Sequence, residues 1–301
     1  MSKIVLTLWA IVNISSNFVR EKPDYESPLL TQSLMGSVYE VKDSCGYWKK
    51  ISDPGFYEGW VTDLGLAYMN DRQKDAYLEA PKYICTAKHS CIYSKPDAES
   101  EPVCDFSMGD LVRKMRNFSG NFREVILPSG VTGWVDVEDV EDFRGWAETR
   151  TLDAESIVRT AKSFLGVPYM WGGNTSKYFD CSGLSHFTYR MCGVLLPRDA
   201  KDQINTGRKI PVDLRKMQAG DLVFFGRKAD GGKTVKVTHV AIYIGDGKII
   251  HSSHFVRINS LREGAPDYYR KEIVGVRRII GHVDEGTEAR SILKDPSYFK
   301  Q

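Results

Sequence analysis

The sequence predicts an α+β protein in which two small all-β modules precede one domain that mixes helices and strands. Two observations carry this prediction. The first half of the chain contains a tandem repeat built from short runs of strand-forming residues. After Trp146 the pattern changes to alternating helix and strand signals. The expected boundaries are 1–70 and 71–146 for the two modules and 147–301 for the mixed domain.

The repeat is visible as short segments that recur at a nearly constant spacing. Three segments of the first copy have counterparts in the second: 22–27 (KPDYES) in 95–100 (KPDAES), 35–36 (MG) in 108–109, and 59–61 (GWV) in 133–135. The offset is 73 residues for the first two and 74 for the third. Strand-forming runs between such turn signals are typical of a small barrel. We expect Trp60 and Trp134 to pack in the two barrel cores.

Charge and the N-terminal segment exclude two classes of partner. The formal net charge is only +2 and no long run has one sign, so we expect no nucleic-acid partner. Residues 4–12 fit either a short signal-peptide core or a β-strand, and we favour the strand because this segment begins the first repeat. These nine residues are too few to cross a bilayer, so we expect no membrane span.

The six cysteines predict free thiols rather than a metal site. No C-x-x-C pair occurs among them. Scattered thiols of this kind are typical of a reducing compartment. We therefore expect no metal, no cofactor and no disulfide framework.

One cysteine stands at the predicted start of a helix and is the candidate nucleophile. Asp153 is the expected N-cap of a preceding helix over 154–165. The next helix is expected to begin at Cys181, and one apolar face is marked by Leu184, Phe187, Met191 and Val194. A helix start favours thiolate and supplies N–H donors for an oxyanion, so we expect a lowered pKa at Cys181. An inert buried cysteine is the alternative, and polar Asp180 and Ser182 beside it argue against that.

Two histidines are the candidate bases. His239 begins a strand of β-branched and aromatic residues, and His251 ends the next strand across the turn at 245–247. A hairpin of this length places the two imidazoles side by side, so that one can take a proton while the other orients it. Two histidines at paired positions, together with an activated cysteine, favour a catalytic role over a structural one.

Five motifs occur in a fixed order across residues 150 to 280 and resemble the NlpC/P60 family of papain-like cysteine peptidases. They are Tyr169-x-Trp171-Gly172-Gly173, Asp180-Cys181-Ser182-Gly183, Leu196-Pro197-Arg198-Asp199, the segment 219–225 (AGDLVFF) and the segment 238–245 (THVAIYIG). The two repeats, each with a terminal Gly-Trp-Val, resemble bacterial SH3 (SH3b) modules. This combination is similar to the YkfC type of γ-D-glutamyl-L-diamino acid endopeptidase, or dipeptidyl-peptidase VI.

The resemblance implies a role for each matching residue. Cys181 would be the nucleophile, His239 the general base and then acid, and His251 the polar residue that holds the imidazole. Tyr169 would help to bind the oxyanion. The other matching positions would contact substrate, and they are Glu58, Tyr93, Trp171, Ser182 and Asp199. Within this set, Asp199, Glu58 and Tyr93 would hold the free amino group of an N-terminal L-Ala. An ordinary helix N-cap is the alternative for Asp199, and a solvated turn residue is the alternative for Glu58.

The expected activity is that of a cysteine endopeptidase of peptidoglycan recycling. Its substrate would be a murein tripeptide or tetrapeptide with free L-Ala, cleaved between γ-D-Glu and the diamino acid. We expect a cytoplasmic monomer, with the periplasm as the alternative compartment. Two other functions stay open: an SH3b-anchored hydrolase or amidase acting on intact murein, and an acyltransferase on the same core. Diaminopimelate and lysine are not distinguished, and Ala200, where many relatives carry Ser, leaves the dipeptide preference open.

Overall fold

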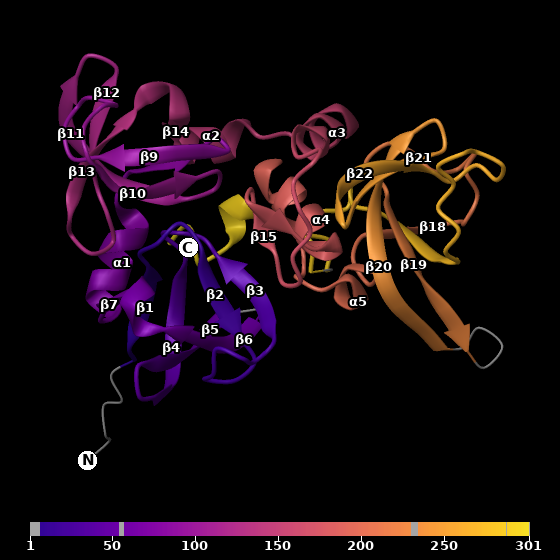
Figure 1. Ribbon diagram of the computed structural model, residues 1–301, viewed down its shortest axis with the longest axis horizontal. Coiled ribbons are helices and arrows are strands. Elements are labelled where there is room, and N and C mark those ends of the chain that lie inside the picture. The colour runs from indigo at the N-terminus through magenta and orange to yellow at the C-terminus, as the bar shows by residue number, and fades with distance from the viewer. Residues whose placement is uncertain (1–6, 54–56, 230–233, 287, 301) are drawn as a thin grey trace. The chain divides into compact units, whose positions relative to one another are not determined.

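The computed structural model describes residues 7–53, 57–229, 234–286 and 288–300. The chain divides into two compact units, Met1–Thr149 with Leu293–Gln301, and Arg150–Ile292 (Figure 1). The last nine residues thus group with the N-terminal unit and not with the mixed domain. Within the described ranges, no helix combines the length and the apolar character that a membrane span requires.

The N-terminal unit contains two antiparallel sheets of seven strands each among its described residues. The first sheet is formed by β1 (Trp9–Val12), β2 (Asn17–Arg20), β3 (Leu29–Ser33), β4 (Val38–Cys45), β5 (Trp48–Asp53), β6 (Tyr57–Thr62) and β7 (Leu66–Met69). The second is formed by β8 (Lys82–Cys85), β9 (His89–Tyr93), β10 (Pro102–Ser107), β11 (Leu111–Ser119), β12 (Phe122–Ile126), β13 (Thr132–Asp136) and β14 (Val140–Asp142). The first three residues of the strand expected over 4–12 lie outside the described residues.

The two sheets have one topology. The strand order is β3-β2-β6-β5-β4-β1-β7 in the first and β10-β9-β13-β12-β11-β8-β14 in the second. Adding seven to each strand number of the first order gives the second. The repeat found in the sequence is therefore also a repeat of the fold.

The repeated tryptophans do not fill the sheet cores, and the expectation that they would is wrong. Trp60 and Trp134 are half-buried, whereas Val61 and Val135, one residue later, are fully buried. Successive side chains of a strand point to opposite faces, so the valines of the Gly-Trp-Val segments face the cores and the tryptophans face away.

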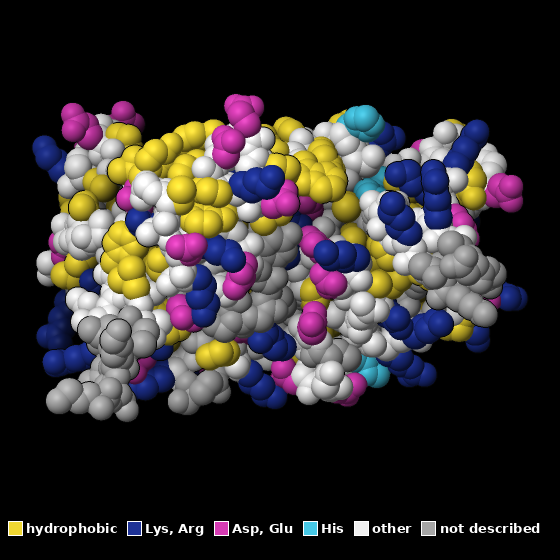
Figure 2. Space-filling view, turned by 90° about the horizontal axis from the view of Figure 1, so that it is seen from below, with side chains coloured by type: hydrophobic (Ala, Val, Ile, Leu, Met, Phe, Trp, Pro, Cys, Tyr) yellow, Lys and Arg dark blue, Asp and Glu magenta, His cyan; other side chains and the backbone are white. Residues whose placement is uncertain are grey.

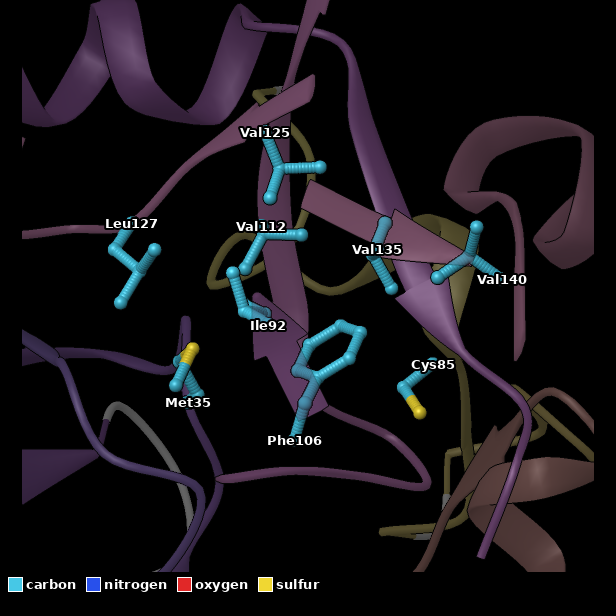
Figure 3. Packing of buried hydrophobic residues seen from close by; sticks show 9 residues of the cluster. All are labelled: Met35, Cys85, Ile92, Phe106, Val112, Val125, Leu127, Val135 and Val140. Atoms are coloured by element: carbon cyan, nitrogen blue, oxygen red, sulfur yellow. The ribbon is translucent and has the colours of Figure 1, made fainter. Parts of the chain in front are cut away.

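A turn of the first repeat joins the two sheets. Met35 packs in the core of the second sheet beside Phe106 and Leu127 (Figure 3). Its N–H donates to Asp110 Oδ1 at 2.9 Å, and its carbonyl accepts from Leu111 N–H at 3.0 Å. The approach needs a glycine next to Met35, because a Cβ on Gly36 would lie 2.6 Å from the Leu111 Cβ. Gly36 also has φ +85°, where side chains are strained.

Two helices and the C-terminal segment complete this unit. Helix α1 (Asp71–Glu79) was not predicted, although it begins with a capping box formed by Asn70 and Gln73. Helix α2 is Phe143–Thr149. The Phe299 ring stacks on Phe143 with a centroid distance of 5.0 Å, and Lys300 donates to Glu79 at 2.6 Å. These contacts explain why the last residues belong to this unit.

The C-terminal unit mixes three helices with a six-stranded antiparallel sheet among its described residues. The sheet order is β18 (Arg208–Ile210), β23 (Ile273–Arg278), β19 (Leu222–Ala229), β20 (Thr234–Gly245), β21 (Lys248–Ser253) and β22 (Phe255–Ser260). The helices are α3 (Ala154–Ser163), α4 (Cys181–Met191) and α5 (Ala200–Gln203), and the short strands are β15 (Asn174–Thr175), β16 (Tyr178–Phe179), β17 (Val194–Leu195) and β24 (Arg290–Ser291).

Helix α4 packs directly against the sheet through β20 and β21 (Figure 1). Its Phe187 ring meets Phe164, just after α3, at 5.6 Å, and the Phe179 ring completes the cluster. Both helices predicted in this region are confirmed, and Asp153 caps α3 by accepting from Ser156 N–H. Helix α4, whose first residue is the candidate nucleophile, thus packs on the sheet, and α5 and α3 also contact it through β20.

Candidate active site

The loop that precedes α4 is pressed against the helix start. Asp180 is the N-cap, and its Oδ1 accepts from Gly183 N–H at 2.7 Å. Its Oδ2 accepts from Gly172 N–H at 2.9 Å. Position 183 must be glycine, since a Cβ there would lie 1.9 Å from the Gly173 carbonyl oxygen. The Gly-Gly loop and the Asp-Cys-Ser-Gly turn therefore form one tightly packed structure that fixes Cys181 as the first helical residue.

A buried ion pair holds this turn in place. Arg198 donates from Nη2 to Asp180 Oδ2 at 2.6 Å and from Nη1 to Oδ1 at 3.0 Å. The two side chains are 4% and 11% exposed. Arg198 Nη1 also donates to the Ser182 hydroxyl at 3.0 Å. The motif containing Arg198 was recognised in the sequence, but this role was missed. The Ser182 hydroxyl, expected to contact substrate, lies in this buried network.

The thiol of Cys181 is not activated in the way the sequence predicted. Burial, followed by the charge of Asp180, raises its pKa to about 11. The backbone N–H groups of Val240 and Ser182 and the charge of Arg198 act in the opposite direction without overcoming burial. The expected lowering of the pKa is therefore wrong for the substrate-free site, because burial of the thiol outweighs the N–H groups at the helix start.

The two histidines meet as the hairpin geometry predicted. His239 Nε2 lies 2.7 Å from His251 Nδ1, and His251 Nε2 lies 2.9 Å from Asn259 Oδ1. The Asn259 amide is oriented by its Nδ2, which donates to the Asp267 carbonyl at 2.6 Å. All three side chains are buried, with exposed fractions of 6%, 1% and 6%.

These hydrogen bonds fix the tautomers of both rings. Asn259 Oδ1 can only accept, so His251 Nε2 carries its proton and His251 Nδ1 is an acceptor. His239 Nε2 must then donate to it, which leaves the lone pair of His239 on Nδ1. Burial lowers the pKa of His239 to about 3 and that of His251 to about 4, so both rings are neutral at pH 7. His239 therefore presents a free Nδ1 that can accept a proton.

Neutral thiol and neutral imidazole predict a distinctive alkylation profile. With a thiol pKa near 11 and an imidazole pKa near 3, no thiolate–imidazolium pair exists between pH 5 and 9. We expect the iodoacetamide rate at Cys181, measured as wild type minus Cys181→Ala, to rise about tenfold per pH unit up to at least pH 9. A rate plateau between pH 5 and 8 would show a preformed ion pair and contradict this result.

Two tyrosines lie close to the nucleophile. Burial, followed by the charge of Cys181, raises the pKa of both Tyr169 and Tyr269 to about 12. The Tyr269 ring packs against both catalytic candidates, with its centroid 4.7 Å from His251 and 5.6 Å from His239. Its hydroxyl is buried and has no hydrogen-bond partner among the described residues. No sequence pattern pointed to Tyr269, which lies in an irregular segment before β23.

The remaining predicted residues are distributed over both units. Trp171 is 69% exposed in the C-terminal unit. Asp199 precedes α5 but makes no capping hydrogen bond, and it pairs with Lys201 at 3.4 Å.

Glu58 on β6 pairs with Lys50 at 2.9 Å, and this ion pair lowers the pKa of the Glu58 carboxyl. Tyr93 on β9 packs edge-on to Phe122. Glu58 and Tyr93 belong to the N-terminal unit, so their expected contact with substrate stays a prediction.

Comparison with known proteins gives a consistent result. Residues 166–278 match the model of the NlpC/P60 family. A gamma-D-glutamyl-L-lysine dipeptidyl-peptidase of Bacillus cereus is 33% identical, over 84% of this chain and 75% of the relative. A protein of the same name from Bacillus subtilis is 30% identical, over 84% of this chain and 82% of the relative.

A solved structure extends the likeness to three dimensions. The crystal structure of an NlpC/P60 family protein from Bacillus cereus matches with a TM-score of 0.75 and 28% identity, over 90% of this chain and 99% of that one. The matched segment holds Cys181, His239 and His251, the three side chains on which the site is built. On this likeness over most of its length, the chain belongs to the NlpC/P60 family of cysteine peptidases.

Proposed function

We propose that this peptidase cleaves the bond between γ-D-Glu and an L-diamino acid in peptidoglycan peptides that carry a free N-terminal L-Ala. The observation that carries the proposal is the hydrogen-bonded series Asn259, His251, His239. It leaves a proton-accepting nitrogen on His239, whose neighbour on β20, Val240, contacts Cys181 through its backbone N–H. The names of the two Bacillus relatives, gamma-D-glutamyl-L-lysine dipeptidyl-peptidases, support the choice of bond.

The reaction follows from the tautomers. As the Cys181 sulfur attacks the γ-carbonyl carbon, its proton passes to His239 Nδ1, because thiol and imidazole both start neutral. In this proposal the backbone N–H at the start of α4 and the Tyr169 hydroxyl donate to the oxyanion. Collapse of this intermediate breaks the C–N bond, and His239 gives its proton to the leaving amine. Water then attacks the thioester, again through His239, which releases the dipeptide acid and restores the thiol.

His251 and Asn259 act by positioning His239. When His239 becomes charged, its Nε2–H donates to His251, whose own proton is held by Asn259. The imidazolium is thereby stabilised and kept in one orientation, which is the role of the third member of a catalytic triad.

Replacing Asn259 with Leu is expected to lower kcat about tenfold or more while KM changes little. The substitution removes the acceptor that fixes the His251 tautomer, so His251 Nδ1 can carry the proton and no longer accept from His239. Steady-state kinetics with thermal unfolding as a separate readout tests this. The matched variant Asn259→Asp keeps an acceptor and should retain more activity. Equal losses in kcat for both variants, tracking the loss in Tm, would point to a structural role only.

Recognition of a free amino group is the second part of the proposal. Asp199 is a partly exposed carboxylate that pairs with Lys201, and the Lys201 side chain is 69% exposed. A surface ion pair of this kind is weak, so a substrate ammonium can replace the lysine. Asp199 makes no capping hydrogen bond, so helix capping does not account for it. An ammonium group bound out of water needs such a carboxylate.

Acetylating the N-terminal L-Ala of the substrate is therefore expected to reduce kcat/KM about 100-fold or more. Hydrolysis of the free and acetylated tripeptides is compared in wild type and in Asp199→Asn. The variant should lose activity toward the free peptide and should discriminate less between the two. Equal rates of wild type on both peptides would overturn amino-group recognition. Cleavage of intact sacculi at the rate of free peptide would favour a wall hydrolase instead.

The proposed substrate also indicates the biological process in which the reaction takes place. Peptides with a free L-Ala amino group have already been released from the glycan, so we infer a role in recycling murein tripeptides or tetrapeptides. The assignment of the two seven-stranded sheets as SH3b modules, a monomeric state and a cytoplasmic location remain predictions from the sequence.

A further inference from the structure

A hollow lined mainly by charged side chains lies on the six-stranded sheet of the C-terminal unit. It has a volume of about 410 Å³. The residues that line it come from β19, β20 and the segment before β23: Gly226, Arg227, Lys236, Thr238, Lys271 and Glu272. We call this hollow the basic pocket. None of the residues that form the proposed catalytic series lines it.

The basic pocket begins one residue from the catalytic base. Thr238, which lines it, precedes His239 on β20, and adjacent residues of a strand are about 3.3 Å apart along its axis. On the other side of His239, the Val240 N–H donates to the Cys181 thiol. The Lys271 ammonium lies 5.7 Å from the centroid of Tyr269, the ring that packs on both histidines. Lys271, which lines the pocket, is also one of the charges that lower the pKa of both His239 and His251, so the pocket lies within electrostatic range of the catalytic pair.

The basic pocket has a net positive charge, which favours an anionic ligand. Its lining contains three basic residues, Arg227, Lys236 and Lys271, and one acid, Glu272. That acid also pairs with Lys228 at 3.8 Å, outside the lining, so the pocket carries an excess of positive charge. Figure 2 shows several Lys and Arg side chains on the end of the view that holds the six-stranded sheet. The charges are exposed to water, so binding will be moderate and sensitive to salt.

We propose that the basic pocket is a subsite for a carboxylate of the substrate that flanks the scissile bond. The inference rests on the proposed function, which supplies two such groups: the α-carboxylate of D-Glu and the terminal carboxylate of the diamino acid. The free amino group at the other end of the peptide has the wrong charge for this pocket and the right one for Asp199. Opposite charges at two places would fix the direction in which the peptide lies across Cys181.

The test uses three tripeptides: the free acid, its C-terminal amide, and the α-amide at D-Glu. Each is assayed with wild type, with the double variant Arg227→Gln/Lys236→Gln, and with the control Lys248→Gln. Lys248 lies in the same sheet and is exposed, but it does not line the pocket. The double variant leaves Lys271 in place, so the electrostatics of the two histidines are preserved as far as possible.

In wild type and in Lys248→Gln, one of the two amides is expected to raise KM about fivefold relative to the free acid, with kcat little changed. The amide that does so identifies which carboxylate is bound. In Arg227→Gln/Lys236→Gln, KM for the free acid should rise by a similar factor. The ratio of the KM values for the amide and the free acid should then be closer to one than in wild type. Equal KM values for all three peptides in wild type, or an unchanged acid-to-amide ratio in the double variant, would overturn the subsite.

If the proposed function itself is wrong, the same experiment gives a different result. If wild type cleaves none of the peptides, the proposed reaction is wrong, and the subsite is then judged by calorimetric titration of Cys181→Ala with the same three peptides. A weaker Kd for one amide, lost when Arg227→Gln/Lys236→Gln is added, supports a carboxylate subsite. Equal Kd values, or no binding of any peptide, contradict it.

Discussion

Cys181→Ala is expected to lower kcat by about four orders of magnitude or more and to leave the Kd for the tripeptide within about threefold. The sulfur is the only atom lost, and it is the one that forms the covalent bond to the substrate. Asp180 still caps α4, and Arg198 still holds the turn, because neither contact involves the thiol. The measurement is a single-turnover assay together with calorimetry of the same preparation.

The matched control is Cys192→Ala at the other end of the same helix. Cys192 is buried and free, and its sulfur lies 3.9 Å from the Thr160 hydroxyl. Truncating it should cost stability and leave kcat within about twofold of wild type. Turnover by Cys181→Ala at the wild-type rate, or an equal loss in both variants, would remove Cys181 from the chemistry.

Arg198→Met is expected to destabilise the C-terminal unit by about 3–5 kcal/mol and to abolish activity. The substitution leaves the Asp180 carboxylate buried without its two-point partner, and it also releases the Ser182 hydroxyl. Because Asp180 caps α4, the loss reaches the position of Cys181 directly. Urea unfolding, followed through the transition of this unit, gives the change in free energy.

Two variants make that result interpretable even if Arg198→Met does not fold. Arg198→Lys keeps the charge but not the fork of two hydrogen bonds, and it should fall between wild type and Arg198→Met in both stability and kcat. Arg215→Gln removes an arginine that is 88% exposed and pairs with Asp213, and no measurable change in unfolding is expected. Equal midpoints for Arg198→Lys, Arg198→Met and wild type would show that the buried pair does not hold the site.

Elements with a local signal could be predicted from the sequence. Asp153 and Asp180 are side chains that cap the residues just after them, so the starts of α3 and α4 were readable. The contact between the His239 and His251 rings follows from one tight turn and the alternation of strand residues. The common topology of the two sheets follows from the sequence repeat, which needs no knowledge of packing.

Features that depend on burial or on distant segments could not be predicted in this way. Asn259 reaches His251 from a neighbouring strand, and Tyr269 reaches both histidines after an irregular segment with no periodic pattern. The helix start suggested an acidic thiol at Cys181, but burial of the thiol and the charge of Asp180 raise its pKa instead. The orientation of Trp60 was misjudged because the Gly-Trp-Val segment does not reveal which face of the strand is covered.

The central claim is that Cys181 cleaves one particular bond of a free peptide. It is tested most directly by incubating the protein with L-Ala-γ-D-Glu-L-Lys, and with the diaminopimelate analogue, and identifying the products by mass. We predict L-Ala-D-Glu and the free diamino acid from wild type and neither product from Cys181→Ala. Release of free L-Ala, or intact tripeptide under conditions in which sacculi are solubilised, would contradict the claim.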